Sequence, residues 1–461
     1  MNENENDPLD YNRRDFLKGG SVATLMTMLG GVELLAAESA PAPTGELKSN
    51  EKVKVAVIGL GAWGREILNT LGRMPMADIA AICDTYPSSL RRAATAAPGA
   101  IQTPDYKTIL ANNDIKAVII ATPTHLHKDI TLDSLKAGKH TYCEAPLANT
   151  IEDARTIALA GKASKLSLFQ VGLQIRSDPE RHFLVPFIRS GALGRFVMAR
   201  AQSHKKQSWR TASPNPEREK ALNWRLDKDI SIGLVGEQGC HPIDQANWFL
   251  NALPLAVTGF STMALWDADG RQVPDTVRTM IEYPGHIYLD YDATLANSFD
   301  GNYEMFYGSD AAVLIRDNKA WLFKETDAPL LGWEVYARKD KFYEETGIAL
   351  VANASKSVQQ APKPGETEIS NPILMSALDR FLKNASDAEI TLATGREAFK
   401  DDPDSLADTF SEFVKKLASS QNRATAGSLE GYQATVIGIK ANEAAIAGKR
   451  IEINPDLYKL S

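Results

Sequence analysis

The glycine-rich segment at residues 54–64 constrains the fold more than any other part of this 461-residue chain. An apolar, β-branched run leads into Gly59, Gly61 and Gly64, and a helical pattern follows at residues 65–71. In a Gly-x-Gly-x-x-Gly loop the first glycine permits a tight turn and the second lets a pyrophosphate approach the backbone, while the third lets the helix pack closely on the strand. The segment therefore predicts a strand, a turn and a helix that bind a dinucleotide.

An acidic residue follows at the distance that this kind of loop requires. A second apolar run ends in Asp84, about 20 residues after the last glycine. A carboxylate at this position accepts the ribose hydroxyls of an adenosine and repels a 2′-phosphate. We therefore expect NAD rather than NADP, although Arg91 and Arg92 nearby weaken that preference. Ala62 and Trp63 complete the expected cofactor-binding loop.

The hydrophobic pattern predicts two domains of different architecture. Up to about residue 171, short apolar strands alternate with helical stretches, which indicates a doubly wound parallel sheet. Later strands are joined by tight turns, which indicates a largely antiparallel, open sheet. These later strands are expected at residues 195–203, 276–283, 286–295 and 303–315.

Helical patterns accompany the second sheet. A helix at residues 236–250 is expected to pack between this sheet and the first domain, and a long amphipathic helix is expected at 429–447. The predicted fold class is α/β, with a Rossmann domain followed by an α+β domain. The expected division is a signal peptide and linker at 1–45, the Rossmann domain at 46–171, the substrate domain at 172–370, and a helical segment at 371–461 that packs back on both domains.

The first 45 residues have the features of an export signal. Arg13 and Arg14, followed by an apolar pair and a lysine, resemble the twin-arginine signal. The uncharged stretch at 19–32 is roughly 14 residues long, whereas a membrane-spanning helix needs about 20. A small-x-small cleavage site at 37–39 and a Pro/Ala linker at 40–44 follow. We expect export by the Tat machinery to the periplasm without stable membrane insertion; the alternative is a disordered tail with a chance arginine pair.

Charge and cysteine content narrow the partners. The net charge of −7 provides no basic field to hold nucleic acid or an anionic membrane, so small molecules or other proteins are expected instead. Cys83, Cys143 and Cys240 are far apart and form no Cys-x-x-Cys pair. They are therefore expected to be small buried apolar residues rather than a disulfide framework or a zinc ribbon.

Four local patterns, in this order, resemble the Gfo/Idh/MocA family, which is named for glucose-fructose oxidoreductase and inositol dehydrogenase. They are the glycine loop with Asp84, the Ala-Thr-Pro-Thr-His-Leu-His run at 121–127, the Glu-Ala-Pro run at 144–146, and the segment at 237–244. The resemblance covers roughly residues 50 to 450. Any one pattern alone would be unspecific, but together they are fairly specific.

The resemblance places several residues near the nicotinamide ribose. In such families the segment that matches Thr122 and Pro123 passes beside this ribose, and the glutamate that matches Glu144 helps to hold it. His127 is placed there as well. The alternatives are that Pro123 merely ends a strand and that His127 is a core histidine with satisfied hydrogen bonds.

The same resemblance suggests a catalytic base. Ala145 replaces the family lysine that assists proton movement, and Glu237 replaces the usual aspartate. On one helix, Glu237 and Asp244 would lie on the same face as His241 and orient its imidazole, as a general base requires. His241 is therefore the candidate base; the alternative is a structural, helix-capping histidine. No metal site is expected, because Cys240 lies off that face.

Residues that contact the substrate are less clearly marked. By the resemblance, Gln174 and Arg176 follow the last strand of the first domain and face the active site. Aromatic and cationic side chains can stack on sugar rings and hydrogen-bond to them, although packing explains each one alone better than ligand contact does. The further candidates are Trp209, Trp224, Arg225, Asp244 and Tyr303.

Three functions remain open at this stage. An exported oxidoreductase leaves the cytoplasmic nicotinamide pool behind, so its NAD would have to stay tightly bound. It could oxidise one sugar and reduce another, or it could resemble the family's redox-neutral NAD-dependent glycosidases, which oxidise, eliminate, add water and re-reduce. The third alternative is a non-catalytic sugar-binding relative. The resemblance also implies homo-oligomers formed through the open face of the second sheet.

Overall fold

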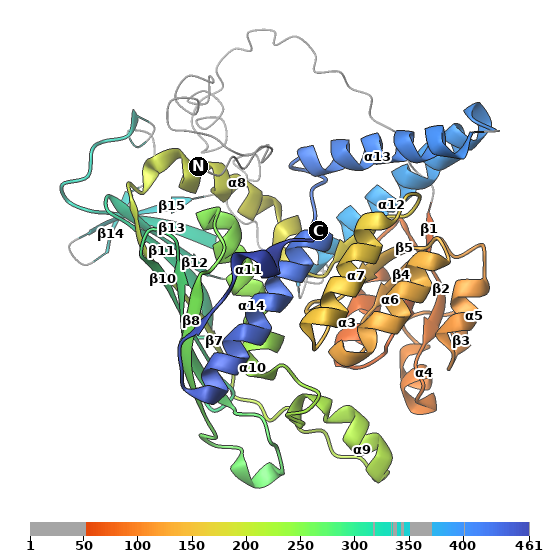
Figure 1. Ribbon diagram of the computed structural model, residues 1–461, viewed down its shortest axis with the longest axis horizontal. Helices are drawn as coiled ribbons and strands as arrows, with labels where there is room; N and C mark the ends of the chain where they lie inside the picture. Colours follow the sequence, from red (N-terminus) through yellow and green to blue (C-terminus); the bar gives the residue numbers. More distant parts are fainter. Residues whose placement is uncertain are drawn as a thin grey trace, which may run out of the picture.

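The computed structural model describes residues 52–316, 319–332, 334, 339–342, 345–350, 371–400 and 402–460 (Figure 1). For residues 339–342 and 345–350 the description is of the backbone. The expected signal and linker at residues 1–45 lie outside the described residues.

The first domain contains a parallel sheet of six strands in the order β3-β2-β1-β4-β5-β6. The order reverses between β1 and β4, and in such sheets this is where a dinucleotide binds. Successive residues of β1 face opposite sides, so that Val55 and Val57 join one core while Ala56 and Ile58 join the other. The strands are β1 Val53–Ile58, β2 Ala77–Cys83, β3 Ile101–Thr103, β4 Ala117–Ile120, β5 His140–Cys143 and β6 Phe169–Val171.

Helices cover both faces of this sheet, as doubly wound folds require. One covering helix, α12 (Pro372–Ala398), comes from the C-terminal segment, where Leu378 and Phe381 complete the core around β1 and α3. The first domain is therefore built from both ends of the described chain. Its other helices are α3 Ala62–Leu71, α4 Pro87–Ala93, α5 Tyr106–Ala111, η1 Thr124–Leu126, α6 His127–Lys136 and α7 Ile151–Ala163.

The second domain contains a sheet of ten described strands in the order β14-β15-β13-β12-β11-β7-β10-β9-β8-β16. The β7–β10 pair is parallel and the other pairs are antiparallel, which confirms the expected fold class. The strands are β7 Phe196–His204, β8 Ala256–Thr262, β9 Thr276–Tyr283, β10 Ile287–Thr294, β11 Asn302–Gly308, β12 Ala311–Arg316, β13 Lys319–Lys324, β14 Lys339–Phe342, β15 Glu345–Leu350 and β16 Ile451–Glu452.

The helix expected at residues 236–250 is two helices, α10 (Gly233–Glu237) and α11 (Cys240–Leu250). They lie between the sheet and the first domain as expected, since α10 contacts β9 and β10 while Glu237 accepts the Thr124 hydroxyl. They share this position with α14 (Ser428–Ala447), which contacts α7 on one side and β8 and β9 on the other. Figure 1 shows α14 running between the sheet and the helices of the first domain. The prediction of an amphipathic helix here was wrong, because α14 is buried along most of its length and has no broad solvent face.

The remaining helical elements join these layers. Within the described chain, no helix is long and apolar enough to cross a membrane. All three cysteines are free and buried, as expected. The elements are η2 Gln174–Ser177, α8 Pro179–Phe187, η3 Ile188–Ala192, α9 Pro216–Leu222, η4 Trp224–Leu226, η5 Asp267–Asp269, α13 Pro403–Ser419 and η7 Pro455–Tyr458.

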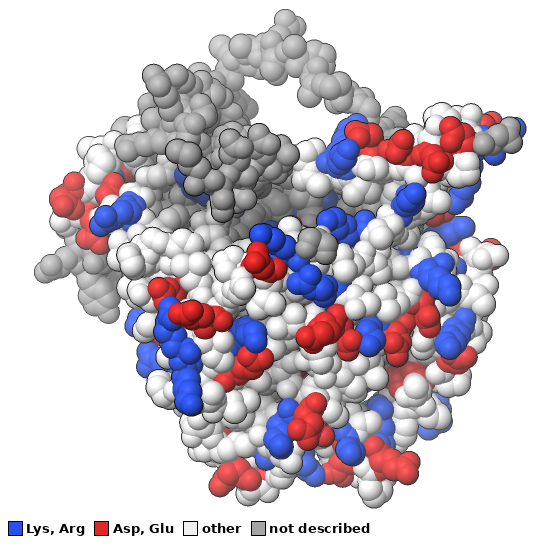
Figure 2. Space-filling view, in the orientation of Figure 1, with Lys and Arg blue, Asp and Glu red and all other residues white. Residues whose placement is uncertain are grey.

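On the face of the molecule shown in Figure 2, basic and acidic side chains are interspersed. No broad patch of a single sign is visible on that face. This distribution matches the small negative net charge and offers no track for a nucleic-acid backbone there.

Candidate active site

The three glycines after β1 fill three different structural roles. Gly59 has a φ of +95°, and a Cβ atom on it would lie 2.7 Å from the carbonyl carbon of Ala121. A Cβ atom on Gly64 would lie 1.9 Å from the carbonyl oxygen of Gly59, whereas one on Gly61 would meet no atom within 4 Å. Gly59 and Gly64 are thus fixed by the packing of the turn, while Gly61 leaves the open space that a pyrophosphate needs at the start of α3.

Asp84 lies beside this turn at the end of β2. Its Oδ2 accepts the Leu60 N–H at 2.9 Å, and its Oδ1 accepts the Tyr86 N–H at 2.8 Å. A carboxylate offers about four acceptor sites, so both oxygens keep capacity for the hydroxyls of a ribose. The site fits the adenosine half of NAD, with its carboxylate held in place by the backbone.

The loop after β4 contains Thr122, Pro123 and His127. The buried His127 ring lies 2.9 Å from the carbonyl oxygen of Thr122 and 3.0 Å from that of Pro146, through different ring nitrogens. Burial lowers the pKa of His127 to about 4. The neutral ring has one N–H and so donates to only one of these two carbonyls, and both of its nitrogens face the loops after β4 and β5 rather than the cofactor.

Glu144 is 7% exposed at the end of β5. Burial raises the pKa of its carboxyl to about 7, and this rise is opposed by the side chains of Trp63, Tyr142 and Gln174. Within the described chain, Glu144 Oε1 has no hydrogen-bond partner, and neither does Thr122 Oγ1 of the neighbouring loop. Two orphaned polar atoms at the ends of β4 and β5 are what a site for a polar ligand would present.

The turn between α10 and α11 joins the second domain to this place. Glu237 Oε2 accepts the Thr124 hydroxyl at 3.0 Å and lies 3.9 Å from Arg225 Nε. Glu237 Oε1 is buried and has no partner among the described residues, and burial raises the pKa of this carboxyl. The Thr124–Glu237 hydrogen bond thus fixes the α10–α11 turn against the loop after β4.

His241 lies in the first turn of α11, next to Cys240. Burial lowers the pKa of His241 to about 4, so its imidazole is neutral near pH 7 and able to accept a proton. In the described part of the chain, no hydrogen bond or ion pair to another residue engages this imidazole.

The expected pairing of His241 with Glu237 and Asp244 was wrong. The helix is interrupted at Gln238 and Gly239, and each carboxylate has a different partner. Asp244 accepts two hydrogen bonds from Arg176, at 2.8 Å and 2.9 Å. This buried ion pair joins η2 to α11, so both of these substrate candidates are already engaged with each other.

Aromatic and cationic side chains gather beside Glu237. The guanidinium carbon of Arg225 lies 4.6 Å from the ring centre of Trp224 and 5.7 Å from that of Trp209. The His125 ring lies 5.8 Å from Trp224, and its buried Nδ1 has no hydrogen-bond partner among the described residues. The sequence analysis chose His127 as the site histidine, whereas the structure places His125 in this aromatic group. Its contact with Trp224 joins two distant segments, so the sequence pattern carried no signal for it.

Tyr303 does not join this group. On β11, Phe306 faces the core and packs on Phe249, with ring centres 5.0 Å apart. Because side chains alternate along a strand, Tyr303 faces the opposite, open side of the sheet. There the guanidinium carbon of Arg316 lies 4.9 Å from the centre of its ring. Tyr303 is therefore corrected from a substrate candidate to a residue of the open face.

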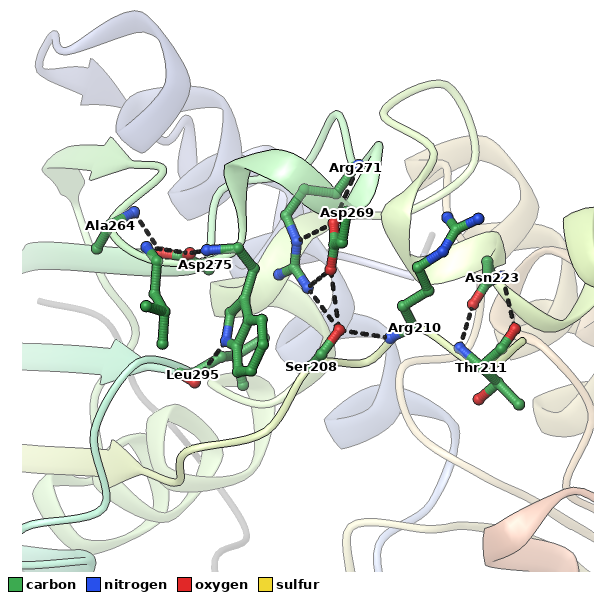
Figure 3. A network of polar contacts seen from close by, with 11 residues as sticks. Ser208, Arg210, Thr211, Asn223, Ala264, Asp269, Arg271, Asp275 and Leu295 are labelled. Atoms are coloured by element: carbon green, nitrogen blue, oxygen red, sulfur yellow. Dashed lines mark hydrogen bonds and ion pairs between the residues drawn. The ribbon is translucent and has the colours of Figure 1, made fainter.

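The segment that carries Trp209 is held at its base by a polar network (Figure 3). Ser208 donates to Asp269 at 2.9 Å and accepts from Arg271 at 3.3 Å and from the Arg210 N–H at 3.1 Å. Asp275 accepts three backbone N–H groups of the adjacent turn, those of residues 264–266. The network leaves Trp209 on a fixed base rather than on a free loop.

The parallel sheet with a glycine turn at its switch point defines a dinucleotide-binding domain, and the open sheet beside it defines a two-domain protein. Residues 53–172 match the model of an oxidoreductase family with an NAD-binding Rossmann fold, and residues 186–313 match that of the GFO/IDH/MocA C-terminal domain. Together these matches span more than half of the chain. The chain belongs to the Gfo/Idh/MocA oxidoreductase family, and its first domain is an NAD-binding domain.

Relatives include enzymes of more than one kind. The chain is 28% identical to levoglucosan dehydrogenase of Pseudarthrobacter phenanthrenivorans, over 57% of this chain and 73% of that protein. It is 36% identical to an inositol 2-dehydrogenase of Arthrobacter, over 33% of this chain and 45% of that protein. It is 25% identical to a glycosyl hydrolase family 109 protein of Shewanella baltica, over 44% and 50%. The last two matches thus cover about half of those relatives.

Solved structures share the fold. A levoglucosan dehydrogenase in complex with NADH superposes with a TM-score of 0.65 at 20% identity, covering 88% of this chain and all of that one. An aldose-aldose oxidoreductase from Caulobacter crescentus gives a TM-score of 0.59 at 18% identity, covering 87% of this chain and all of that one.

Proposed function

We propose that this protein oxidises a CH–OH group of a sugar or glycoside with a tightly retained NAD. The observation that carries the proposal is the position of His241 at the start of α11, directly after the α10–α11 turn. The Thr124–Glu237 hydrogen bond holds this turn against the NAD-binding domain, and burial lowers the pKa of His241 so that its imidazole is neutral near pH 7. Relatives named for levoglucosan and inositol support a polyhydroxylated substrate.

The residues present fit NAD. Gly61 leaves room for the pyrophosphate, Asp84 keeps acceptor capacity for the ribose, and Thr122 and Glu144 present orphaned oxygens at the nicotinamide end. NAD, when bound, supplies the hydride acceptor. We assign NAD rather than NADP, because the Asp84 carboxylate would repel a 2′-phosphate.

The chain's own groups would then position the substrate and move its proton. His241 accepts the proton of the substrate hydroxyl, because its imidazole is unprotonated at neutral pH. Trp209 offers an aromatic face to the sugar ring, and Arg225, which lies over the buried ring of Trp224, offers hydrogen-bond donors. Glu237 holds Arg225 and Thr124 on either side of its buried carboxylate.

One observation favours a second candidate, a redox-neutral glycosidase. Ala145 stands where the family has the lysine that assists proton movement, and one relative is a family 109 glycosyl hydrolase. In that scheme His241 would take the proton of the same hydroxyl while its carbon would be oxidised to a carbonyl, with NAD as the hydride acceptor. The neighbouring C–H would then give its proton to a base, the glycosidic C–O bond would break with the aglycone as leaving group, water would add to the resulting double bond, and return of the hydride would restore the hydroxyl.

Incubation of the purified protein with a panel of glycosides and free sugars, without added cofactor, separates the candidates. A ketose or lactone formed with stoichiometric reduction of a second sugar supports the oxidoreductase. Released aglycone with sugar of unchanged oxidation state selects the glycosidase. The non-catalytic alternative requires that no dinucleotide is found in the denatured extract and that no product forms.

Export by the Tat pathway to the periplasm belongs to the same proposal. Arg13 and Arg14 support it, and retention of NAD follows from it, because a folded protein can carry its cofactor across. Replacing both arginines by lysine should keep the protein in the cytoplasm, as cell fractionation would show. Periplasmic protein in unchanged amount would contradict a twin-arginine signal.

We further propose a homo-oligomer formed through the open face of the ten-stranded sheet. Phe260 is 66% exposed and Met280 is 52% exposed there, on neighbouring strands β8 and β9. Exposed apolar side chains grouped on one sheet face are typical of an interface. Met280→Glu should lower the mass measured by light scattering after gel filtration, whereas a monomeric wild-type protein would contradict the proposal.

A further inference from the structure

A segment of the second domain reaches the nucleotide-binding sheet at a point that the site described above does not include. Helix α9 has no buried side chain, so it does not belong to the core of its own domain. Its Arg218 lies over Tyr86 of the first domain, with the guanidinium carbon 4.4 Å from the ring centre. Arg218 Nη2 lies 3.5 Å from Ser89 Oγ of α4.

The position of this contact relates it to the cofactor. The Tyr86 N–H donates to Asp84, the carboxylate at the ribose position, so Tyr86 lies at the adenosine end of the site. Arg218 thus meets the first domain where the adenosine half of NAD would enter and leave. Its Nε is buried and has no hydrogen-bond partner among the described residues, so it is available to an acceptor on a ligand.

The segment that carries α9 is braced at both ends. Asn223 accepts the Thr211 N–H at 2.7 Å and donates to the Thr211 carbonyl at 3.0 Å, which closes the segment into a loop. Arg210 and Glu219 form an ion pair across that loop. The Ser208 network anchors its base to the turn at residues 264–271 (Figure 3). The backbone that carries Arg218 is therefore held in a fixed position beside Tyr86.

We propose that α9 is a strap over the adenosine half of NAD, and that Arg218 is the residue that makes the cofactor slow to leave. The inference rests on the proposed function, in which NAD is retained rather than exchanged. Arg218 crosses from one domain to the other and stacks on Tyr86, a cation–π contact that must break before the bound dinucleotide is exposed.

The test is the dissociation rate of NAD. Protein loaded with radiolabelled NAD is diluted into excess unlabelled NAD, and the label that remains is followed by rapid filtration. Arg218→Gln should release NAD about tenfold faster, which corresponds to about 1.4 kcal/mol. Lys220→Gln is the matched control, because it removes the same charge from an exposed position of the same helix and should leave the rate unchanged.

Substitutions of Tyr86 test the same contact from the other domain. Tyr86→Phe keeps the ring and should release NAD at the wild-type rate, whereas Tyr86→Ala should match Arg218→Gln. Melting temperatures of the NAD-free variants establish that each one folds. If Arg218→Gln misfolds, Tyr86→Ala decides the question alone.

The possible results distinguish this inference from the proposed function. If the emptied wild-type protein binds no NAD in calorimetry, the proposed function itself fails. If the wild-type protein binds NAD but Arg218→Gln and Tyr86→Ala both release it at the wild-type rate, only the strap is refuted. Equal acceleration by Lys220→Gln would show a general charge effect and would also refute it.

Discussion

At the scale of single residues, the site is defined by side chains whose pKa values burial has shifted toward the neutral form. His241 and Glu144 come from different domains, and burial alters the pKa of each toward the neutral form. A neutral imidazole and a carboxyl that titrates near pH 7 are suited to accepting and holding protons. Removal of His241 should therefore change turnover, and removal of the Glu144 carboxyl should change how stability depends on pH.

His241→Ala should lower turnover by about 10²- to 10⁴-fold, the usual contribution of a positioned acid or base. Because the pKa of His241 is lowered to about 4, wild-type kcat/KM should stay level down to about pH 5 and fall below it. Steady-state kinetics on the substrate found in the panel measures both effects. Unchanged turnover of a folded His241→Ala variant would remove this residue from the mechanism.

Glu144 gives the NAD-free protein a specific pH dependence. The unfolded chain loses this proton near pH 4.5, whereas the folded protein keeps it to about pH 7. Unfolding therefore releases a proton between these values, and stability falls as the pH rises through them. Glu144→Gln cannot ionise, so it should match the wild-type protein at pH 4 and exceed it by about 3 kcal/mol at pH 8.

Urea titrations at the two pH values measure this difference. Glu412→Gln is the matched control, because Glu412 is exposed on α13 and its loss should leave the pH slope unchanged. A Glu144→Gln variant with the wild-type pH slope would show that this carboxyl is already ionised at pH 5.

At the scale of elements, two glycines of the strand–turn–helix unit at β1 and α3 serve different purposes, one for folding and one for NAD binding. Gly59→Ala should destabilise the protein by about 2 kcal/mol or more, because its φ is positive and its Cβ would press on Ala121. Gly61→Ala should leave the melting temperature of the NAD-free protein unchanged, because nothing lies within 4 Å of its Cβ. Its NAD affinity should nevertheless fall at least tenfold, because the methyl group fills the pyrophosphate position.

Calorimetric titration with NAD and thermal melting measure the two quantities separately. Each glycine serves as the control for the other. Normal NAD affinity in Gly61→Ala would mean that the pyrophosphate does not approach this turn.

At the scale of the whole molecule, the Arg176–Asp244 ion pair fixes η2, the first element after the Rossmann domain, to α11 of the second domain. Arg176→Met leaves a buried carboxylate unpaired and should cost about 3 to 5 kcal/mol. The double variant Arg176→Met, Asp244→Leu should recover most of that loss, because apolar side chains often replace a buried pair without cost.

The free energy of unfolding in urea tests this coupling. Arg278→Met is the control, because Arg278 pairs with Asp290 on the exposed sheet face and should contribute less than about 1 kcal/mol. A double variant as unstable as the single one would show that Arg176 acts through another contact.

The sequence by itself determined the local chemistry of the cofactor domain. The glycine spacing, the acid at the end of β2 and the apolar strand runs are properties of short segments. They can therefore be recognised in the sequence without knowledge of tertiary contacts. The family resemblance likewise rested on short motifs. Even in the second domain, strands such as β9 were visible because alternation along a strand is a local signal.

Only the tertiary structure decided which residues meet. His241 lies within reach of two carboxylates along the sequence, yet Glu237 is bound to Thr124 and Asp244 to Arg176. The sequence did not predict three further features either. These are the buried position of α14, the place of Tyr303 on the open face and the Arg218–Tyr86 contact. The physical reason is that burial and ion pairing depend on side chains brought together from distant segments, whereas turn and strand patterns depend on neighbours in the chain.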